Sequence, residues 1–497
     1  MRAVPSKLPR LWWLVVPLAY VLYFHGMSAT GVLGPDEPRY ASIGREMANS
    51  GDWITPRLWG EPWFEKPALL YWMTGLAFRA GLGPDTAPRL PVALASLAFL
   101  IFFYAALRRE FGTAAAWTSS LALGTCAGWI GFSAVGVTDL PLAAALSVAM
   151  LLCLPWVARG DARALPWASA WLGVAVLAKG LVPLVLAVPL LWMGRKNWRD
   201  LLHPRAWLPF LIVAVPWYWL CWLRNGYPFI RTFFLEHHFG RFTSTALLHG
   251  QPWWFYLPVL AGGLLPWTPL LIQGRRTLFD DARIRFLFLW VGFGLVFFSA
   301  AANKLPGYLL PLVPAAAALA GIALDRTRDA RPWLAACALL LVVLPVAAQM
   351  LPAALANGLS RAPRPAFHWF WLFPIVLAAA AWRMESAGRR EMAVLLIAGG
   401  AAAGILYIKQ TASPGIEQSV SARPLWRSVA ARRDQVCVED LHRNWRYGLN
   451  YYSVKPLPDC SAEPRPLHIQ QTPGQAPAVA AGLDPHSIAV IPSHFRY

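Results

Sequence analysis

The chain has 497 residues, of which 57% are hydrophobic and only 14% are charged. This composition excludes an ordinary soluble protein, because apolar segments of about 17 to 25 residues, the length of a membrane-spanning helix, recur along the sequence. The net charge of +19 comes mostly from basic residues in short connectors between apolar segments, as expected for a membrane protein rather than a nucleic-acid-binding one.

Thirteen membrane-spanning helices are expected in an all-α polytopic protein. The N-terminal apolar run resembles a signal peptide, but it continues to about Val32 without a small-residue cleavage site, so it is predicted to remain as the first span. Eleven spans are single apolar segments: 11–32, 88–107, 113–135, 139–158, 206–223, 255–273, 286–302, 306–324, 333–352, 367–382 and 391–408. Residues 164–194 supply two more as a hairpin.

The basic connectors place the N-terminus in the cytoplasm and the polar tail outside the membrane. Residues 1–408 are predicted to form the membrane domain, with two long outer loops at 33–87 and 224–254. Residues 409–497 are predicted to form a small outer α/β domain. Its expected elements are a helix at 423–433 and strands at 435–439, 466–470 and 487–492. Cys437 and Cys460 lie in this tail, where a disulfide is possible in an oxidising compartment.

An acidic pair, Asp36 and Glu37, opens the first outer loop in the stretch Gly-Pro-Asp-Glu-Pro-Arg-Tyr at positions 34–40. One interpretation is a helix start, because acidic residues favour a helix N-terminus and Pro38 suits a first helical position. The helix would run from Pro38 to Ser50 along the membrane surface and end at Gly51. The other interpretation is a catalytic carboxylate at the mouth of the membrane domain.

Lys179 lies at the tip of the predicted hairpin, in Ala178-Lys179-Gly180. The hairpin is too short for two full crossings, which need about 40 residues, so its tip should stop below the outer surface. A lysine there is costly unless it is paired or hydrated, which makes it a functional candidate. The alternative is a lysine whose ammonium group extends to the outer interface.

The predicted outer face gathers carboxylates, cations and imidazoles. They are Asp36, Glu37, Arg39, Arg57, Glu65, Lys66, Asp139, Arg231, Glu236, His237, His238, Arg241 and Lys304. Taken singly, Asp139 could cap a helix and Lys304 could anchor a span at the membrane edge. Together these groups suit a lipid-linked phosphate, which needs cations to stabilise its charge as it leaves and a carboxylate to orient or deprotonate an acceptor.

Five motifs in order resemble the bacterial aminoarabinose lipid A transferases, which belong with the protein O-mannosyltransferases in the GT-C class of glycosyltransferases. The motifs are Asp-Glu-Pro-Arg-Tyr-Ala at 36–41 with Gly-Asp-Trp at 51–53 and Pro-Arg-Leu at 56–58, Phe-Glu-Lys-Pro at 64–67, Ala178-Lys179-Gly180, the run 234–242, and Lys304-Leu305-Pro306 with Tyr308. The resemblance covers about residues 10 to 325. Pro38 departs from the family's Asp-Glu-Thr-Arg pattern, and the chain and its tail look shorter than those of typical members.

The resemblance implies inverting transfer of a sugar, aminoarabinose in the first place, from undecaprenyl phosphate to lipid A on the periplasmic face of the bacterial inner membrane. It implies that Asp36 is the catalytic carboxylate. The cations expected at the donor phosphate are Lys66, Lys179, Arg241, Arg39 and Arg57. The expected substrate-binding residues are Asp139, Lys304 and Tyr308. No cofactor is required, although Glu65 with His237 or His238 is a candidate site for Zn²⁺, Mg²⁺ or Mn²⁺.

Two alternatives remain open. The acceptor could be a hydroxyl of a protein or of another envelope glycolipid, in which case Asp36 would act as a general base. The protein could instead be a transporter or flippase for a polyprenyl lipid, although such proteins often show two repeats and this sequence shows none.

Overall fold

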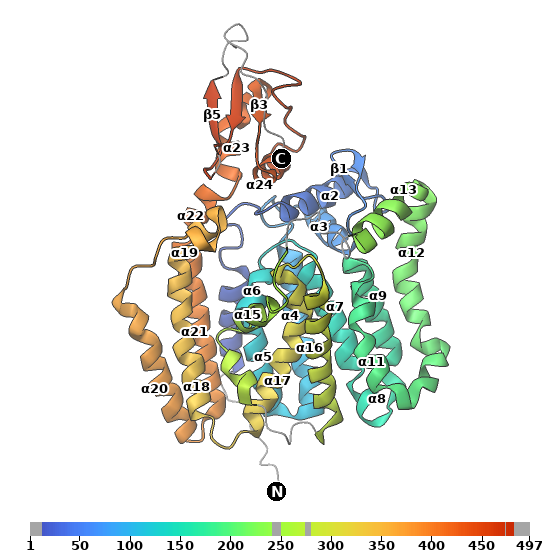
Figure 1. Ribbon diagram of the computed structural model, residues 1–497, viewed down its shortest axis with the longest axis vertical. Coiled ribbons are helices and arrows are strands. Elements are labelled where there is room, and N and C mark those ends of the chain that lie inside the picture. The colour runs from blue at the N-terminus through green and yellow to red at the C-terminus, as the bar shows by residue number, and fades with distance from the viewer. Residues whose placement is uncertain (1–11, 241–249, 274–279, 473, 482–497) are drawn as a thin grey trace.

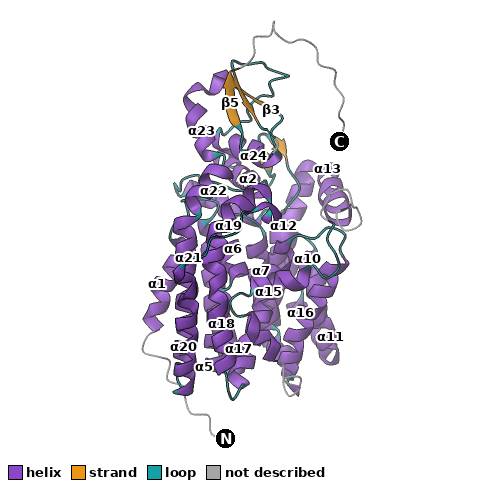
Figure 2. Cartoon of the chain, turned by 60° about the vertical axis from the view of Figure 1, so that its left-hand side comes forward, coloured by secondary structure: helices purple, strands orange, loops and turns teal. Residues whose placement is uncertain are grey.

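The computed structural model describes residues 12–240, 250–273, 280–472 and 474–481. Its helices form a long bundle that carries a layer of short helices and a small α/β unit at one end (Figure 1). The described N-terminal segment starts in the half of the bundle that lies away from the α/β unit. Figure 2 shows that the strands lie at the end with the α/β unit, whereas helices fill the bundle.

The centre of the bundle is built from helices of the first half of the chain together with α15–α17. These are α4 (Leu90–Phe111), α5 (Thr113–Thr125), α6 (Ala127–Ser133), α7 (Asp139–Leu152), α15 (Tyr256–Gly263), α16 (Ala282–Ala300) and α17 (Val313–Arg326). Helix α8 (Leu154–Arg159) follows α7 and lies near α11 (Val188–Met193) (Figure 1).

Two further groups flank this centre on opposite sides (Figure 1). One group contains α9 (Leu165–Lys179), α10 (Val182–Leu186), α11 (Val188–Met193) and α12 (Leu208–Asn225). The other contains α18 (Arg331–Leu339), α19 (Val343–Asn357), α20 (Phe373–Ser386) and α21 (Arg390–Thr411).

Most of the expected spans coincide with helices, but several are interrupted. Within the described residues, six helices are long and apolar enough to cross a membrane: Leu90–Phe111, Asp139–Arg159, Ala282–Ala300, Pro306–Arg326, Arg331–Asn357 and Arg390–Thr411. The first predicted span is shorter than expected. Its helix, α1 (Val15–Ala19) with a π-helical turn to Phe24, ends before Gly26, whose φ of +67° is incompatible with a continuing right-handed helix.

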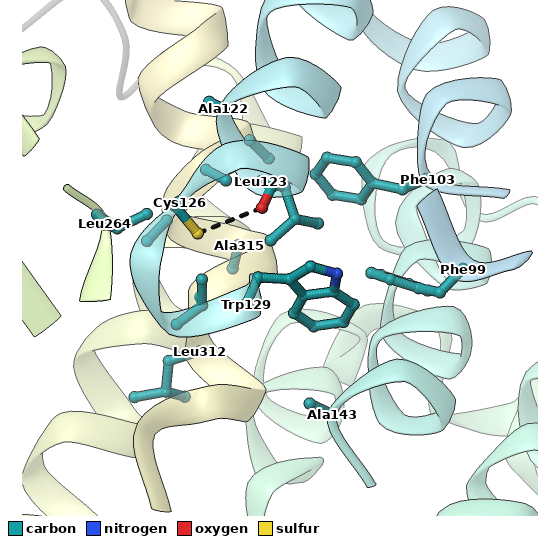
Figure 3. Packing of buried hydrophobic residues seen from close by; sticks show 14 of the residues in the cluster. Phe99, Phe103, Ala122, Leu123, Cys126, Trp129, Ala143, Leu264, Leu312 and Ala315 are labelled. Carbon is teal, nitrogen blue, oxygen red and sulfur yellow. Dashed lines mark hydrogen bonds between the residues drawn. The ribbon is translucent and has the colours of Figure 1, made fainter. Parts of the chain in front are cut away.

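The predicted span at 113–135 bends at Cys126, between α5 and α6. Figure 3 shows the Cys126 thiol donating to the carbonyl of Leu123, at 3.3 Å, amid buried side chains of neighbouring helices. Close packing continues along α5, because a Cβ at Gly321 of α17 would lie 2.5 Å from the backbone nitrogen of Ser119. Small residues let membrane helices approach in this way.

The outer layer, named for its position at the end of the bundle that carries the α/β unit, contains α2 (Asp36–Ser50), the hairpin β1 (Arg57–Leu58) and β2 (Glu61–Pro62), α3 (Leu69–Arg79) and α13 (Tyr227–Ile230). The helix expected at 38–50 is confirmed as α2, which starts two residues earlier and ends before Gly51, at φ +74°. Helix α3, in the same predicted loop, was not expected from the sequence.

The C-terminal α/β unit contains α22 (Ser413–Ser419), α23 (Arg423–Val429), β3 (Val436–Glu439), α24 (Arg443–Tyr452), β4 (Leu467–Gln470) and β5 (Ala478–Ala481). The sheet order is β3-β4-β5, with β3 parallel and β5 antiparallel to β4. Two of the predicted strands are confirmed as β3 and β4, while the third, at 487–492, lies outside the described residues. Cys437 and Cys460 form a disulfide.

Candidate active site

Asp36 stands at the first position of α2, with 47% of its side chain exposed. Its carboxylate Oδ1 accepts a hydrogen bond from Nη2 of Arg39, one helical turn further on. The helix therefore presents Asp36 at the end of the bundle that carries the α/β unit, with its orientation set by a cation on the same helix.

Glu37 is fully buried and is more than the helix cap that the sequence suggested. Its carboxylate accepts two hydrogen bonds from Arg89, at 2.7 and 2.9 Å. It also accepts from the backbone N–H groups of Leu33 and Gly136, at 2.8 and 2.9 Å. Glu37 thus ties the start of α2 to the beginning of α4 and to the loop before α7. Arg89 was not recognised in the sequence, where it reads as a basic residue beside a span.

All three guanidinium nitrogens of Arg39 donate hydrogen bonds to protein acceptors. Besides Asp36, it donates to Oε2 of Glu65 at 2.9 Å and to the carbonyl of Pro35 at 3.0 Å. Burial alone would lower the pKa of Arg39, but the nearby carboxylates of Glu65 and Asp36 raise it above its ordinary value. The guanidinium is therefore a permanent cation between two acids, a geometry that favours a positioning role over the expected phosphate contact.

Glu65 lies between cations and tyrosines in the interior of the outer layer. Its Oε1 is 3.2 Å from Nζ of Lys66, which places a second cation beside the Arg39 pair. Burial raises the pKa of Tyr40 and Tyr71 well above the usual value, and the Glu65 charge raises both further. Both tyrosines therefore remain neutral phenols around a charged core.

A second charged cluster lies at the hairpin tip. Helix α9 ends at Lys179, and Gly180 turns the chain with φ +71°, as the short predicted hairpin requires. Nζ of Lys179 is 2.6 Å from Oδ1 of Asp139 and 5.0 Å from the ring centroid of Tyr308. The lysine is thus paired rather than extended to the membrane surface, and Asp139 binds a cation instead of capping α7.

The 3₁₀ helix before α17, Pro306–Leu312, packs against this second cluster. A Cβ at Gly307 would approach Oδ1 of Asp139 to 3.0 Å, so a larger residue there would press on the acid. Lys304 is largely buried and donates from Nζ to the carbonyl of Ala301 at 2.7 Å. That geometry differs from a lysine anchored at the membrane edge.

The two clusters are joined through Glu37. Its bond to Gly136 places the start of α2 against the loop that leads, three residues later, to Asp139. Asp36 and the Lys179–Asp139 pair therefore lie on neighbouring segments at one end of the bundle.

Some expected site residues are not brought into this arrangement by the described structure. Arg57 donates to the carbonyl of Gly60 at 3.0 Å and closes its own hairpin. Arg241 and the side chains of His237 and His238 lie outside the described residues. The expected metal site with Glu65 is therefore still a prediction. Among the described side chains, one group has suitable metal ligands close together, Cys437, Cys460 and His468, but its two sulfurs form the disulfide.

Comparison with known proteins places this geometry in a family. Residues 65–222 match the family described as dolichyl-phosphate-mannose-protein mannosyltransferase. The undecaprenyl phosphate-alpha-4-amino-4-deoxy-L-arabinose arabinosyl transferase of Pseudomonas paraeruginosa is 31% identical over 491 residues, covering 89% of this chain and 87% of the relative. The chain belongs to this family of arabinosyl transferases. The same enzyme of Pseudomonas aeruginosa is 30% identical over the same shares.

A solved arabinosyl transferase shares the fold. The crystal structure of ArnT from Cupriavidus metallidurans bound to undecaprenyl phosphate has a TM-score of 0.73 and 26% sequence identity, covering 92% of this chain and 93% of that chain. The resemblance seen in the sequence motifs is thereby confirmed. The chain described here is therefore a multi-pass membrane glycosyltransferase of the GT-C type.

Proposed function

We propose that this protein transfers 4-amino-4-deoxy-L-arabinose from undecaprenyl phosphate to lipid A. The match to the arabinosyl transferases over 89% of the chain carries this proposal. In the reaction, an acceptor oxygen forms a bond to the anomeric carbon of the sugar while the bond from that carbon to the phosphate oxygen breaks. Undecaprenyl phosphate leaves with the electron pair, and the anomeric configuration inverts.

The reaction takes place on the periplasmic face of the inner membrane. With the thirteen spans expected from the sequence and a cytoplasmic N-terminus, the outer layer and a C-terminal α/β domain of residues 409–497 would both face the periplasm. The Cys437–Cys460 disulfide supports this orientation, because disulfides form and persist in that compartment. The separate core of this domain, around Val436, Leu449 and Ile469, supports its assignment as a unit of its own.

Lys66 and Lys179 bind the donor phosphate, and the sequence motif adds Arg241, which lies outside the described residues. Lys66 and Lys179 each have an acidic neighbour, Glu65 and Asp139, which holds the ammonium group in place before the donor binds. Cations held in this way stabilise the negative charge that grows on the phosphate as the sugar leaves. Tyr308, beside Lys179, and Lys304 complete the substrate-binding side of the site.

Asp36 acts on the acceptor. A lipid A phosphate is already ionised near neutral pH, so the carboxylate orients it and needs to remove no proton. Arg39 positions Asp36 through their ion pair and reduces the repulsion between the two anions. A protein or glycolipid hydroxyl as acceptor would instead require Asp36 to accept the hydroxyl proton.

The proposal is tested by mass spectrometry of lipid A from cells with and without this gene. We expect lipid A to gain the mass of one or more aminopentose residues only when the gene is present. An unchanged lipid A, with a new hexose or pentose on protein or on another glycolipid, would favour the hydroxyl acceptor. If no glycoconjugate changes, the protein is better explained as a transporter of a polyprenyl lipid than as a glycosyltransferase.

A further inference from the structure

Helix α24 of the C-terminal unit is docked firmly on the layer that carries the site. The hydroxyl of Tyr451 donates to the carbonyl of Pro84 at 2.6 Å, and that of Tyr452 donates to Asp85 at 2.7 Å. Arg423 also pairs with Asp85, at 2.6 Å. Nη2 of Arg45, on α2, donates to the carbonyl of Tyr451 at 2.7 Å. These bonds hold α24 in a defined place against α2 and the segment that joins α3 to α4.

One residue of this helix contacts the charged core of the site. Tyr447 lies four residues before Tyr451, which places it on the same side of α24. The guanidinium carbon of Arg39 is 5.1 Å from the centroid of the Tyr447 ring, a cation–π distance. Tyr40 and Trp63 also face this guanidinium, at 5.8 and 5.6 Å, but both belong to the first outer loop.

Tyr447 also contacts the turn of the β1–β2 hairpin, whose backbone is constrained. Trp59 stands between β1 and β2 with φ +57°, a conformation that bulky residues rarely adopt, and its ring stacks on Tyr447 at 5.8 Å. Tyr447 therefore packs against both Trp59 and Arg39. The C-terminal unit thus contributes one of the three described aromatic rings that surround the guanidinium of Arg39, the group that orients Asp36.

We propose that Tyr447 is a positioning residue through which the C-terminal unit holds Arg39 on Asp36 and Glu65. This role rests on the proposed function, since it assigns Tyr447 to the orientation of the catalytic carboxylate. The aromatic face keeps the guanidinium between the two acids. Without it, the half-exposed Asp36 loses the fixed position of its cation, and small misplacements of reacting groups are costly to the rate.

The test compares Tyr447→Phe with Tyr447→Leu in purified full-length protein, using an undecaprenyl phosphate–aminoarabinose donor and lipid A. Phenylalanine keeps the ring face, whereas leucine keeps apolar volume without it. We expect Tyr447→Phe to retain the wild-type kcat and Tyr447→Leu to lose about tenfold in kcat with little change in donor KM. Thermal unfolding of both variants in detergent checks that the fold is intact.

Two control variants separate this role from general docking. Arg446→Ala changes the neighbouring residue of α24, whose side chain pairs with Asp459 inside the unit, and should leave kcat unchanged. Tyr452→Phe removes docking hydrogen bonds without touching Arg39, so its loss in kcat should be smaller than that of Tyr447→Leu.

The possible outcomes distinguish the two proposals. If the wild type transfers the sugar and Tyr447→Leu has the same kcat as the wild type, the positioning role alone is overturned. The same conclusion follows if Tyr452→Phe and Tyr447→Leu lose kcat equally. Absence of transfer by the wild-type protein overturns the proposed function and the role of Tyr447 together.

Discussion

Arg89 holds Glu37 through two hydrogen bonds, from Nε at 2.7 Å and from Nη2 at 2.9 Å, with both side chains buried. The same arginine donates to the carbonyls of Met27, Thr30 and Gly31. A charged pair this deep is tolerated because nearly all of its hydrogen-bonding groups are satisfied. It joins the segment after the first span, the start of α2 and the start of α4, and so supports the platform on which Asp36 stands.

Glu37→Ala should destabilise the protein by about 3–5 kcal/mol, because it leaves the Arg89 charge buried without its partner. Thermal unfolding of the detergent-solubilised protein measures this loss. Asp36→Asn is the matched control at the preceding position. Because the Asp36 side chain is half-exposed, its replacement should leave the unfolding midpoint nearly unchanged. Equal midpoints for Glu37→Ala and the wild type would contradict the structural role of the pair.

Lys179→Ala should raise the Kd for undecaprenyl phosphate by about tenfold or more, since a hydrogen bond to a charged group contributes about 1.5–3 kcal/mol. Binding to the purified protein is measured by titration with the lipid. Arg205→Ala, an exposed arginine in a predicted cytoplasmic connector, serves as the control. A Kd for Lys179→Ala that matches the control would remove Lys179 from the donor site.

The disulfide should protect the C-terminal unit from local unfolding. Replacing both Cys437 and Cys460 by serine removes a cross-link between residues 23 positions apart, and we expect a loss of about 2–4 kcal/mol. Limited proteolysis should then cleave this unit faster than in the wild type while the helical bundle stays intact. Unchanged cleavage would show that the cross-link contributes nothing to the stability of the unit.

The orientation in the membrane is open to direct test with reporter fusions. Alkaline phosphatase joined after Thr411 should be active, because the end of α21 is expected in the periplasm. The same reporter joined after Asp281, in a basic connector, should be inactive. The reverse pattern of activity would invert the proposed topology and move the site to the cytoplasmic face.

The sequence predicted best what depends on neighbouring residues. Apolar length located helices at most of the expected spans, and the pattern before Gly51 identified α2 almost to its ends. Lys179 and Asp139 were each recognised, yet their pairing could not be read from the sequence because 40 residues separate them. Proximity of that kind depends on helix packing rather than on local pattern.

The interpretation of Glu37, Arg89 and Tyr447 needed the structure. Glu37 looked like a helix cap because an acid in the first turn is favourable whether or not it has a distant partner. Arg89 looked like an ordinary basic residue at the edge of a span. Tyr447 lies in a tail whose docking on α2 has no signal in the sequence, since it rests on contacts between residues about 400 positions apart.

Transfer by purified Asp36→Asn protein tests the central claim most directly. The asparagine keeps the size of the side chain and removes its charge, and Glu37 remains in place to hold the fold. With an undecaprenyl phosphate–aminoarabinose donor and lipid A, we expect wild-type protein to form modified lipid A and Asp36→Asn to form none, while both bind undecaprenyl phosphate and unfold at similar temperatures. Full transfer by the Asp36→Asn protein would contradict the assignment of Asp36 as the catalytic carboxylate.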